Sequence, residues 1–216
     1  MYNIEKKYYL NRVDKMIVLV LSIIVAFLCG SIPTGYIIMK KFHGIDIRTM
    51  GSGNIGSTNV KRVAGLKTAV ATQAGDVIKG LVPVAVAMYI SNIAALPVSK
   101  EVYLCMVAMV TVLGHDYTPF LGFNGGKGVN TTMGAFFLLS PFSIALGVAM
   151  YFVLKKFTDI VSIRSLALGI TITVTCIIFK RPMPIIITSA LASILMIYRH
   201  KDNIKRLVNH EELKRG

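Results

Sequence analysis

The stretch "MIVLVLSIIVAFLCGSIPTGYIIM", residues 16–39, decides the fold class. It contains 24 consecutive, mostly apolar residues, and roughly 20 are enough for an α-helix to cross a bilayer. A polar head precedes it and no small-residue cleavage site follows it, which favours a retained span over a signal peptide. Over the whole chain 54% of the 216 residues are apolar, more than a soluble core of this size needs. The sequence therefore predicts an all-α integral membrane protein.

Further apolar runs follow the first one to the far end of the chain. Six crossings would place the basic loop 51–62 and the basic segment 198–206 on opposite sides of the membrane, against the tendency of Lys and Arg to stay inside. Dividing one run at Ser140–Pro141 into a short half-span and a full span gives about seven transmembrane helices and places both segments on one face. The runs are 16–39, 69–96, 102–121, 131–154, 160–179 and 183–198.

The charge distribution supports this topology. With seven crossings, 16 of the 24 Lys and Arg residues lie inside, seven lie outside, and Lys79 falls within a span. We expect a polar N-terminal extension (1–15), a single transmembrane domain (16–206) and a cytoplasmic C-terminal tail (207–216). The three cysteines are isolated within apolar runs, which is typical of buried, inert thiols and not of a disulfide or a metal site.

The first polar segment, "GSGNIGSTNVKR" (51–62), contains three glycines and ends in two cations. It formally satisfies the dinucleotide pattern G-x-G-x-x-G, and Asp76 follows its last glycine by twenty residues. That motif requires a preceding strand, whereas this loop follows a membrane span. The context therefore excludes a Rossmann site.

The second polar segment, "GHDYTPFLGFNGGKGVNTT" (114–132), contains a GGKG sequence. A P-loop is excluded because Leu121 stands where its first glycine belongs and Gly128 replaces its Ser or Thr. Glycines nevertheless let backbone N–H groups approach an oxyanion, and Lys127 supplies a compact positive charge. Two such loops predict sites for two phosphates. The alternative is that both are tight re-entrant turns whose glycines only permit close helix packing.

A third polar set lies at the membrane edges of the last two spans, in "VSIRS" (161–165) and "YRHKDNIKR" (198–206). His200 and Asn203 are three residues apart, so on a helix they are neighbours and could share one pocket. Taken alone, the basic segment is typical of a topology anchor or of a patch for anionic lipids.

These segments, together with "GSIPTGYII" (30–38), "GIDIRTM" (44–50) and "DVIKG" (76–80), resemble the bacterial acyl-phosphate-dependent glycerol-3-phosphate acyltransferase family over most of the chain. The resemblance implies a seven-span enzyme of the bacterial cytoplasmic membrane, with its active site on the cytoplasmic side. It implies transfer of an acyl group from acyl phosphate to glycerol 3-phosphate, giving lysophosphatidate for phospholipid synthesis. We expect a monomer among membrane lipids, without cofactor, metal or nucleic acid.

The resemblance also carries over site residues. Catalytic roles are expected for Ser52, Lys127 and His200. Substrate-binding roles are expected for Asn54, Asn59, Arg62, His115, Gly125, Gly126, Gly128, Ser165 and Asn203. Arg62 would grip one phosphate bidentately, and Lys127 would neutralise the other phosphate or the leaving group. We expect direct transfer, with Ser52 as a hydrogen-bond donor and with His200 or the substrate's own phosphate taking the proton.

The sequence differs from the family pattern at two places. Arg164 stands where the family carries a small residue, and "NHEEL" (209–213) replaces a glycine-containing segment around Glu212. A divergent paralogue with another acceptor is therefore an alternative. A transporter for a phosphorylated metabolite is a second alternative, since half-spans beside basic loops also suit anion sites. The placement of all polar motifs on one face favours the enzyme.

Overall fold

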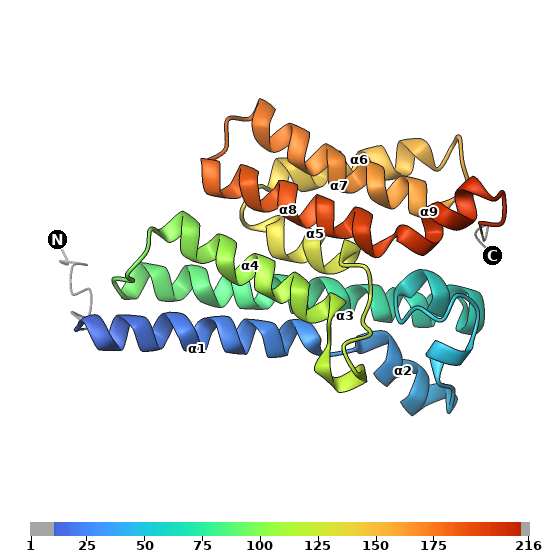
Figure 1. The fold of residues 1–216 in the computed structure, drawn as a ribbon, viewed down its shortest axis with the longest axis horizontal. Coiled ribbons are helices and arrows are strands. Elements are labelled where there is room, and N and C mark those ends of the chain that lie inside the picture. The colour runs from blue at the N-terminus through green and yellow to red at the C-terminus, as the bar shows by residue number, and fades with distance from the viewer. Residues whose placement is uncertain (1–10, 213–216) are drawn as a thin grey trace.

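The computed structural model describes residues 11–212. All the secondary-structure elements within this range are α-helices or 3-10 helices (Figure 1). The predicted all-α class is therefore confirmed. The helices are α1 (Arg12–Ser31), α2 (Thr34–His43), η1 (Ile47–Thr49), α3 (Ser57–Ile93), α4 (Lys100–Asp116), η2 (Pro119–Leu121), α5 (Val129–Phe137), α6 (Pro141–Leu154), α7 (Val161–Ile178), α8 (Met183–Arg199) and α9 (Lys201–Val208).

The first apolar run is broken, so the prediction of one continuous span over 16–39 is wrong. Helix α1 ends at Ser31 and α2 begins after Pro33. Proline has no N–H to continue a helix, and it pushes the preceding residue out of the α region; Ile32 accordingly has a ψ of 113°. The carbonyl of Ile32 accepts hydrogen bonds from the ammonium of Lys79 at 2.7 Å and from the N–H of Thr34 at 3.0 Å. A charged side chain of α3 is thus hydrogen-bonded to the backbone at the break between α1 and α2.

Four described helical segments are long and apolar enough to cross a membrane: α1, α3, α4 continued through η2, and α7. A fifth is counted when α8 and α9, which meet at 54°, are taken together. The predicted break near Ser140–Pro141 is present, because α5 ends at Phe137 and α6 begins at Pro141. Seven crossings and the side of each loop stay predictions. The predicted N-terminal extension lies mostly outside the described residues, and α1 begins within it, at Arg12.

Close helix packing brings the elements that carry the site together. A Cβ atom on Gly80 would overlap the backbone of α5 at Thr131, and one on Gly134 would overlap the backbone of α3 at Val77. Helices α3 and α5 therefore lie in backbone contact, as small residues permit in membrane helices. Helix α3 also bends at Gly65, where φ is +78°, which separates its polar start from its apolar body.

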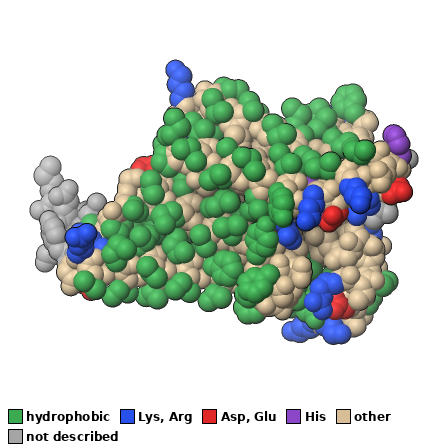
Figure 2. Space-filling view, in the orientation of Figure 1, with side chains coloured by type: hydrophobic (Ala, Val, Ile, Leu, Met, Phe, Trp, Pro, Cys, Tyr) green, Lys and Arg blue, Asp and Glu red, His purple; other side chains and the backbone are tan. Residues whose placement is uncertain are grey.

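The polar elements gather at one end of the molecule. Figure 1 shows α2, the start of α3 and α9 at the end opposite the beginning of α1. Figure 2 shows hydrophobic side chains spread over the middle of the molecule, with Lys, Arg, Asp and Glu concentrated mainly at that same end. This is the surface expected of a helical bundle embedded in lipid with a polar face at one end.

Candidate active site

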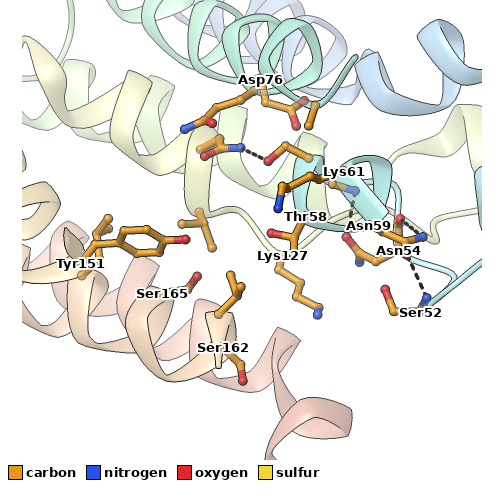
Figure 3. Close-up of a pocket in the computed structure, with 18 of the residues that line it drawn as sticks. Ser52, Asn54, Thr58, Asn59, Lys61, Asp76, Lys127, Tyr151, Ser162 and Ser165 are labelled. Atoms are coloured by element: carbon orange, nitrogen blue, oxygen red, sulfur yellow. Dashed lines mark hydrogen bonds between the residues drawn. The ribbon is translucent and has the colours of Figure 1, made fainter. Parts of the chain in front are cut away.

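A cavity of about 290 Å³ lies at the polar end, between the start of α3, the glycine loop before α5, and helices α6, α7 and α9. All three polar sets of the sequence converge on it, as predicted. Figure 3 shows several of the residues around it. Nine of the expected site residues line the cavity: Ser52, Asn54, Asn59, Arg62, His115, Lys127, Ser165, His200 and Asn203. Gly125, Gly126 and Gly128 are not among the described residues that line it.

The first polar loop is held together by Asn59, whose side chain is 1% exposed. Its amide nitrogen donates to the carbonyls of Met50 at 2.9 Å and Asn54 at 3.0 Å. Its amide oxygen accepts the backbone N–H of Ser52 at 2.9 Å. Because these bonds occupy the side chain, Asn59 shapes the loop, and a substrate would meet the groups that it positions. The substrate-binding role expected for Asn59 stays a prediction.

The glycine loop is rigid where we expected free N–H groups. The N–H of Gly125 donates to the carbonyl of Asp116 at 3.1 Å, and that of Gly126 to the carbonyl of His115 at 3.0 Å. A Cβ atom on Gly125 would overlap the carbonyl of His115, and one on Gly126 would overlap its imidazole ring. Gly128 has a φ of +73° and lies at the start of α5. Gly125 and Gly126 therefore pack the loop against α4. Lys127 is the residue of the GGKG segment that lines the cavity.

Lys127 lies in a chain of hydrogen bonds that crosses the cavity. Its ammonium donates to the amide oxygen of Asn203, and the amide nitrogen of Asn203 donates to Glu212 at 2.6 Å. Burial lowers the pKa of Lys127 to about 8, and the positive charges of Arg206 and Arg62 act in the same direction. A buried ammonium of this kind is stabilised by an incoming anion.

Glu212 is a cavity residue that the sequence left in the C-terminal tail. Its carboxylate accepts hydrogen bonds from Ser162 of α7 at 3.0 Å and from Arg206 of α9 at 3.0 Å, besides the one from Asn203. Burial acts to raise the pKa of Glu212, but these hydrogen bonds outweigh it and hold the pKa below the ordinary value. A single carboxylate therefore joins α7 and α9 beside the cations. The predicted tail is part of the site, and residues 213–216 lie outside the described part of the chain.

His200 and Ser165 also line the cavity. The Nδ1 atom of His200 is 2.8 Å from the carbonyl of Met196, so this nitrogen carries a proton and donates. A neutral His200 then has its lone pair on Nε2. Among the described residues, neither the hydroxyl of Ser52 nor that of Ser165 forms a hydrogen bond with a histidine, so an activated serine nucleophile has no support here.

A buried charged cluster borders the deep end of the cavity. The carboxylate of Asp76 lies 2.8 Å from the ammonium of Lys79 and 3.7 Å from Nδ1 of His115. All three side chains are at most 5% exposed. Asp76 and Lys79 are three residues apart on α3, a spacing visible in the sequence, and paired charges within an apolar run indicate a functional site. The participation of His115 required the fold.

Arg164, the residue that departs from the family pattern, is fully buried beside the cavity. Its guanidinium lies 5.0 Å from the ring centroid of Tyr151 and donates to the carbonyl of Asp159 at 3.3 Å. Tyr151 itself lines the cavity. Arg164 thus contacts the wall residue Tyr151 and is not directly exposed to the cavity.

The cavity combines two chemical environments. The polar part includes Arg62, Lys127, Ser165 and the amide of Asn203, whereas another part of the wall is apolar. The apolar lining residues include Leu66, Val70, Met133, Val148, Phe152 and Leu168. Such a site suits a ligand with an anionic head and an apolar chain, because cations compensate the phosphate charge and the helices cover the chain.

Comparison with known proteins gives a consistent result. A family model described as glycerol-3-phosphate acyltransferase matches residues 20–210. The glycerol-3-phosphate acyltransferase of Clostridium acetobutylicum is 57% identical over 197 residues, 91% of this chain and 100% of that protein. That of Clostridioides difficile is 36% identical over 89% of this chain and 93% of its own length.

Two solved structures share the fold. Both are crystal structures of PlsY, an integral membrane glycerol 3-phosphate acyltransferase, and both are 32% identical to this chain. The glycerol 3-phosphate form has a TM-score of 0.84 and the lysophosphatidic acid form one of 0.82. Each comparison covers 92% of this chain and 96% of the other.

Proposed function

The chain belongs to the glycerol-3-phosphate acyltransferase family, and from this premise we propose that it transfers a fatty acyl group from acyl phosphate to glycerol 3-phosphate. The products are lysophosphatidate and inorganic phosphate, which places the reaction in phospholipid synthesis. The predicted family is confirmed, and the chain is an integral membrane protein as its relatives of known structure are. The observation that carries the proposal is the single cavity that joins cations from α3 and the glycine loop to an apolar wall.

The chemistry requires two phosphates at one site. A hydroxyl of glycerol 3-phosphate attacks the carbonyl carbon of the acyl phosphate, a new ester C–O bond forms, and the bond to the phosphate oxygen breaks. The electron pair of that bond leaves with the phosphate. Cations placed where this negative charge develops lower the barrier. Arg62, in the first turns of α3, and Lys127, in the glycine loop, line the same cavity, which fits one cation for each phosphate.

The hydroxyl proton has two possible acceptors in this scheme. The departing phosphate gains negative charge as the bond breaks, so it can take the proton directly. His200 can accept it at Nε2, because its Nδ1 is committed to Met196. Ser52 and Ser165 line the cavity and supply hydroxyl donors for the substrate oxygens. Neither route needs a covalent acyl-enzyme.

The location follows from the same proposal. We assign the chain to the bacterial cytoplasmic membrane with the cavity open to the cytoplasm, on the basis of the inside excess of Lys and Arg. A Ser57→Cys variant, in a background without the three native cysteines, should resist a membrane-impermeant thiol reagent added outside intact cells. It should react after the membrane is permeabilised. Labelling in intact cells would place the cavity on the outer face.

Purified protein tests the activity directly. With palmitoyl phosphate and glycerol 3-phosphate, we expect release of phosphate and formation of lysophosphatidate in equal amounts. Palmitoyl-CoA, whose thioester presents no phosphate at the carbonyl, should be a poor donor. Absence of acyl transfer, together with glycerol 3-phosphate uptake into proteoliposomes, would support the transporter instead.

A further inference from the structure

Arg199, the last residue of α8, grips the glycine loop from outside the cavity. Its Nε donates to the carbonyl of Gly126 at 3.0 Å, and its Nη2 donates to the carbonyl of Gly125 at 3.2 Å. Arg199 is not among the described residues that line the cavity. Its two hydrogen bonds therefore act on the residues next to Lys127 and not on a substrate.

The N–H groups of the same two glycine residues are bonded to α4. The N–H groups of Gly125 and Gly126 donate to the carbonyls of Asp116 and His115. Both glycine residues are thus bonded through their N–H on one side and through their carbonyl on the other. A peptide segment fixed on both edges loses the freedom that its glycine content would otherwise allow.

The contacts of Arg199 require an arginine. A guanidinium presents N–H donors in a fixed plane, so two neighbouring carbonyls can be bonded at once, whereas a lysine ammonium is a point donor. The guanidinium also lies 4.9 Å from the ring centroid of Tyr117, within the range of a cation–π contact. Tyr117 ends α4, so Arg199 fastens α8 to α4 across the glycine loop.

We propose that Arg199 is a positioning residue that fixes the Gly125–Gly126 peptides and thereby directs Lys127 into the cavity. This rests on the proposed acyl transfer, in which Lys127 stabilises a phosphate. Two cavity residues follow α8 directly: His200, and Asn203, which accepts a hydrogen bond from the Lys127 ammonium. One arginine therefore couples the two parts of the chain that meet at the phosphate site.

The first test is Arg199→Lys, compared with Arg181→Lys as a matched control. Arg181 also donates from its Nη2 to a backbone carbonyl, that of Leu139 at 2.5 Å, but it is not among the cavity residues. We expect Arg199→Lys to lower kcat about 10- to 100-fold. A displaced Lys127 would stabilise the transition state less, whereas binding of the substrate in the ground state would be largely kept. The KM for glycerol 3-phosphate should change less than about threefold. The control should keep kcat within about twofold.

The pH profile separates positioning from a general loss of structure. The charged groups that act on Lys127 are Arg206, Glu212, Arg62 and Asp202, and burial is the main cause that holds its pKa at about 8. If the loop loosens in Arg199→Lys, Lys127 reaches solvent and the alkaline limb of kcat/KM should move to higher pH. An unchanged limb with an unchanged kcat would overturn the proposal.

Tyr117→Leu provides a second variant if Arg199→Lys does not accumulate in membranes. It removes the ring and keeps both hydrogen bonds, so we expect a smaller fall of kcat in the same direction, about 3- to 10-fold. Wild-type kcat in Tyr117→Leu, or equal losses in the Arg199 and Arg181 variants, would contradict a positioning role. An inactive wild-type protein would contradict the proposed function itself, and the two failures are thereby distinguished.

Discussion

Two glycine-rich basic loops border the same cavity, but they use glycine for different reasons. In the first, Gly51 and Gly53 have φ angles of +58° and +71°, so their backbone lies in the left-handed region that other residues avoid. In the second, Gly125 and Gly126 are not among the residues with positive φ. They are glycines because a Cβ would overlap His115. A Cβ on Gly51 would also overlap the amide oxygen of Asn59, and Gly128 in the second loop has a φ of +73°. The contrast is therefore sharpest between Gly53, where backbone conformation requires glycine, and Gly125 and Gly126, where lack of space does.

The loops also differ in what holds them. Asn59 organises the first loop from its interior through side-chain hydrogen bonds to its backbone. The second loop is held from outside, by carbonyls of α4 on one edge and by Arg199 on the other. Consequently the first loop carries its own scaffold, whereas the second depends on the packing of two helices. Substitutions should therefore affect the two loops unequally.

The largest expected effect is that of Lys127→Ala. If the second loop exists to present this ammonium to a phosphate, its loss removes an interaction that strengthens as the leaving group gains charge. Turnover with palmitoyl phosphate should fall by about 100-fold or more, on the order of 3 kcal/mol. Lys180→Ala, at the turn between α7 and α8, should stay near wild type. Near-normal turnover of Lys127→Ala would mean that the second loop serves packing alone.

The next effect tests the lack of space in the second loop. Gly126→Ala places a methyl group where the imidazole of His115 lies, and overpacking of this kind costs about 1–3 kcal/mol. Because the displaced residue neighbours Lys127, we expect kcat to fall about 30-fold. The thermal unfolding midpoint in detergent should fall as well. A double variant, Gly126→Ala with His115→Ala, should recover part of the midpoint, because the overlapping ring is gone.

Much of the fold was predictable because long apolar runs identify membrane helices in the sequence. Five of the six predicted runs coincide with helices, and the break before Pro141 was recognised from its proline. The break at Pro33 was missed, although the same residue type causes it. At this break the carbonyl of Ile32 accepts a hydrogen bond from Lys79, forty-seven residues later, besides the one from the N–H of Thr34, and such a distant partner leaves no local pattern.

Much of the cavity lining was predictable from the sequence, whereas the hydrogen-bond partners of its residues were not. The polar segments identified nine cavity residues. Sequence alone could not show that the side-chain amide of Asn59 is hydrogen-bonded to the backbone, or that the N–H groups of Gly125 and Gly126 donate to α4. Neither Arg199, in the basic segment 198–206, nor Glu212, in the predicted tail, was assigned a role. Their partners lie in other helices, and only the packing of α7, α8 and α9 brings them together.

The third effect concerns pH. Lys127 acts in its protonated form, and burial sets its pKa at about 8. Raising the pH through this value removes the positive charge, so kcat/KM should fall about tenfold per pH unit above it. In the complex, the bound phosphate stabilises the ammonium, and the corresponding limb of kcat should lie at higher pH. Lys127→Arg, whose guanidinium keeps its charge, should lack this limb, and its persistence there would assign it to another group.

The smallest effect returns to the first loop and tests whether its glycines serve conformation. Gly53 has a φ of +71°, and a Cβ there would lie 3.1 Å from the carbonyl oxygen of Arg48, a tight contact that a shift of a few tenths of an ångström relieves. Asparagine tolerates the left-handed region better than other residues with a side chain. Gly53→Asn should therefore cost about 1 kcal/mol or less in stability, with kcat/KM within about twofold. Gly53→Val places a β-branched residue at the same angle and should cost clearly more, although its side chain is no longer than that of asparagine. If both variants instead lost as much activity as Gly126→Ala, Gly53 would also be limited by space, and the physical distinction between Gly53 and Gly126 would disappear.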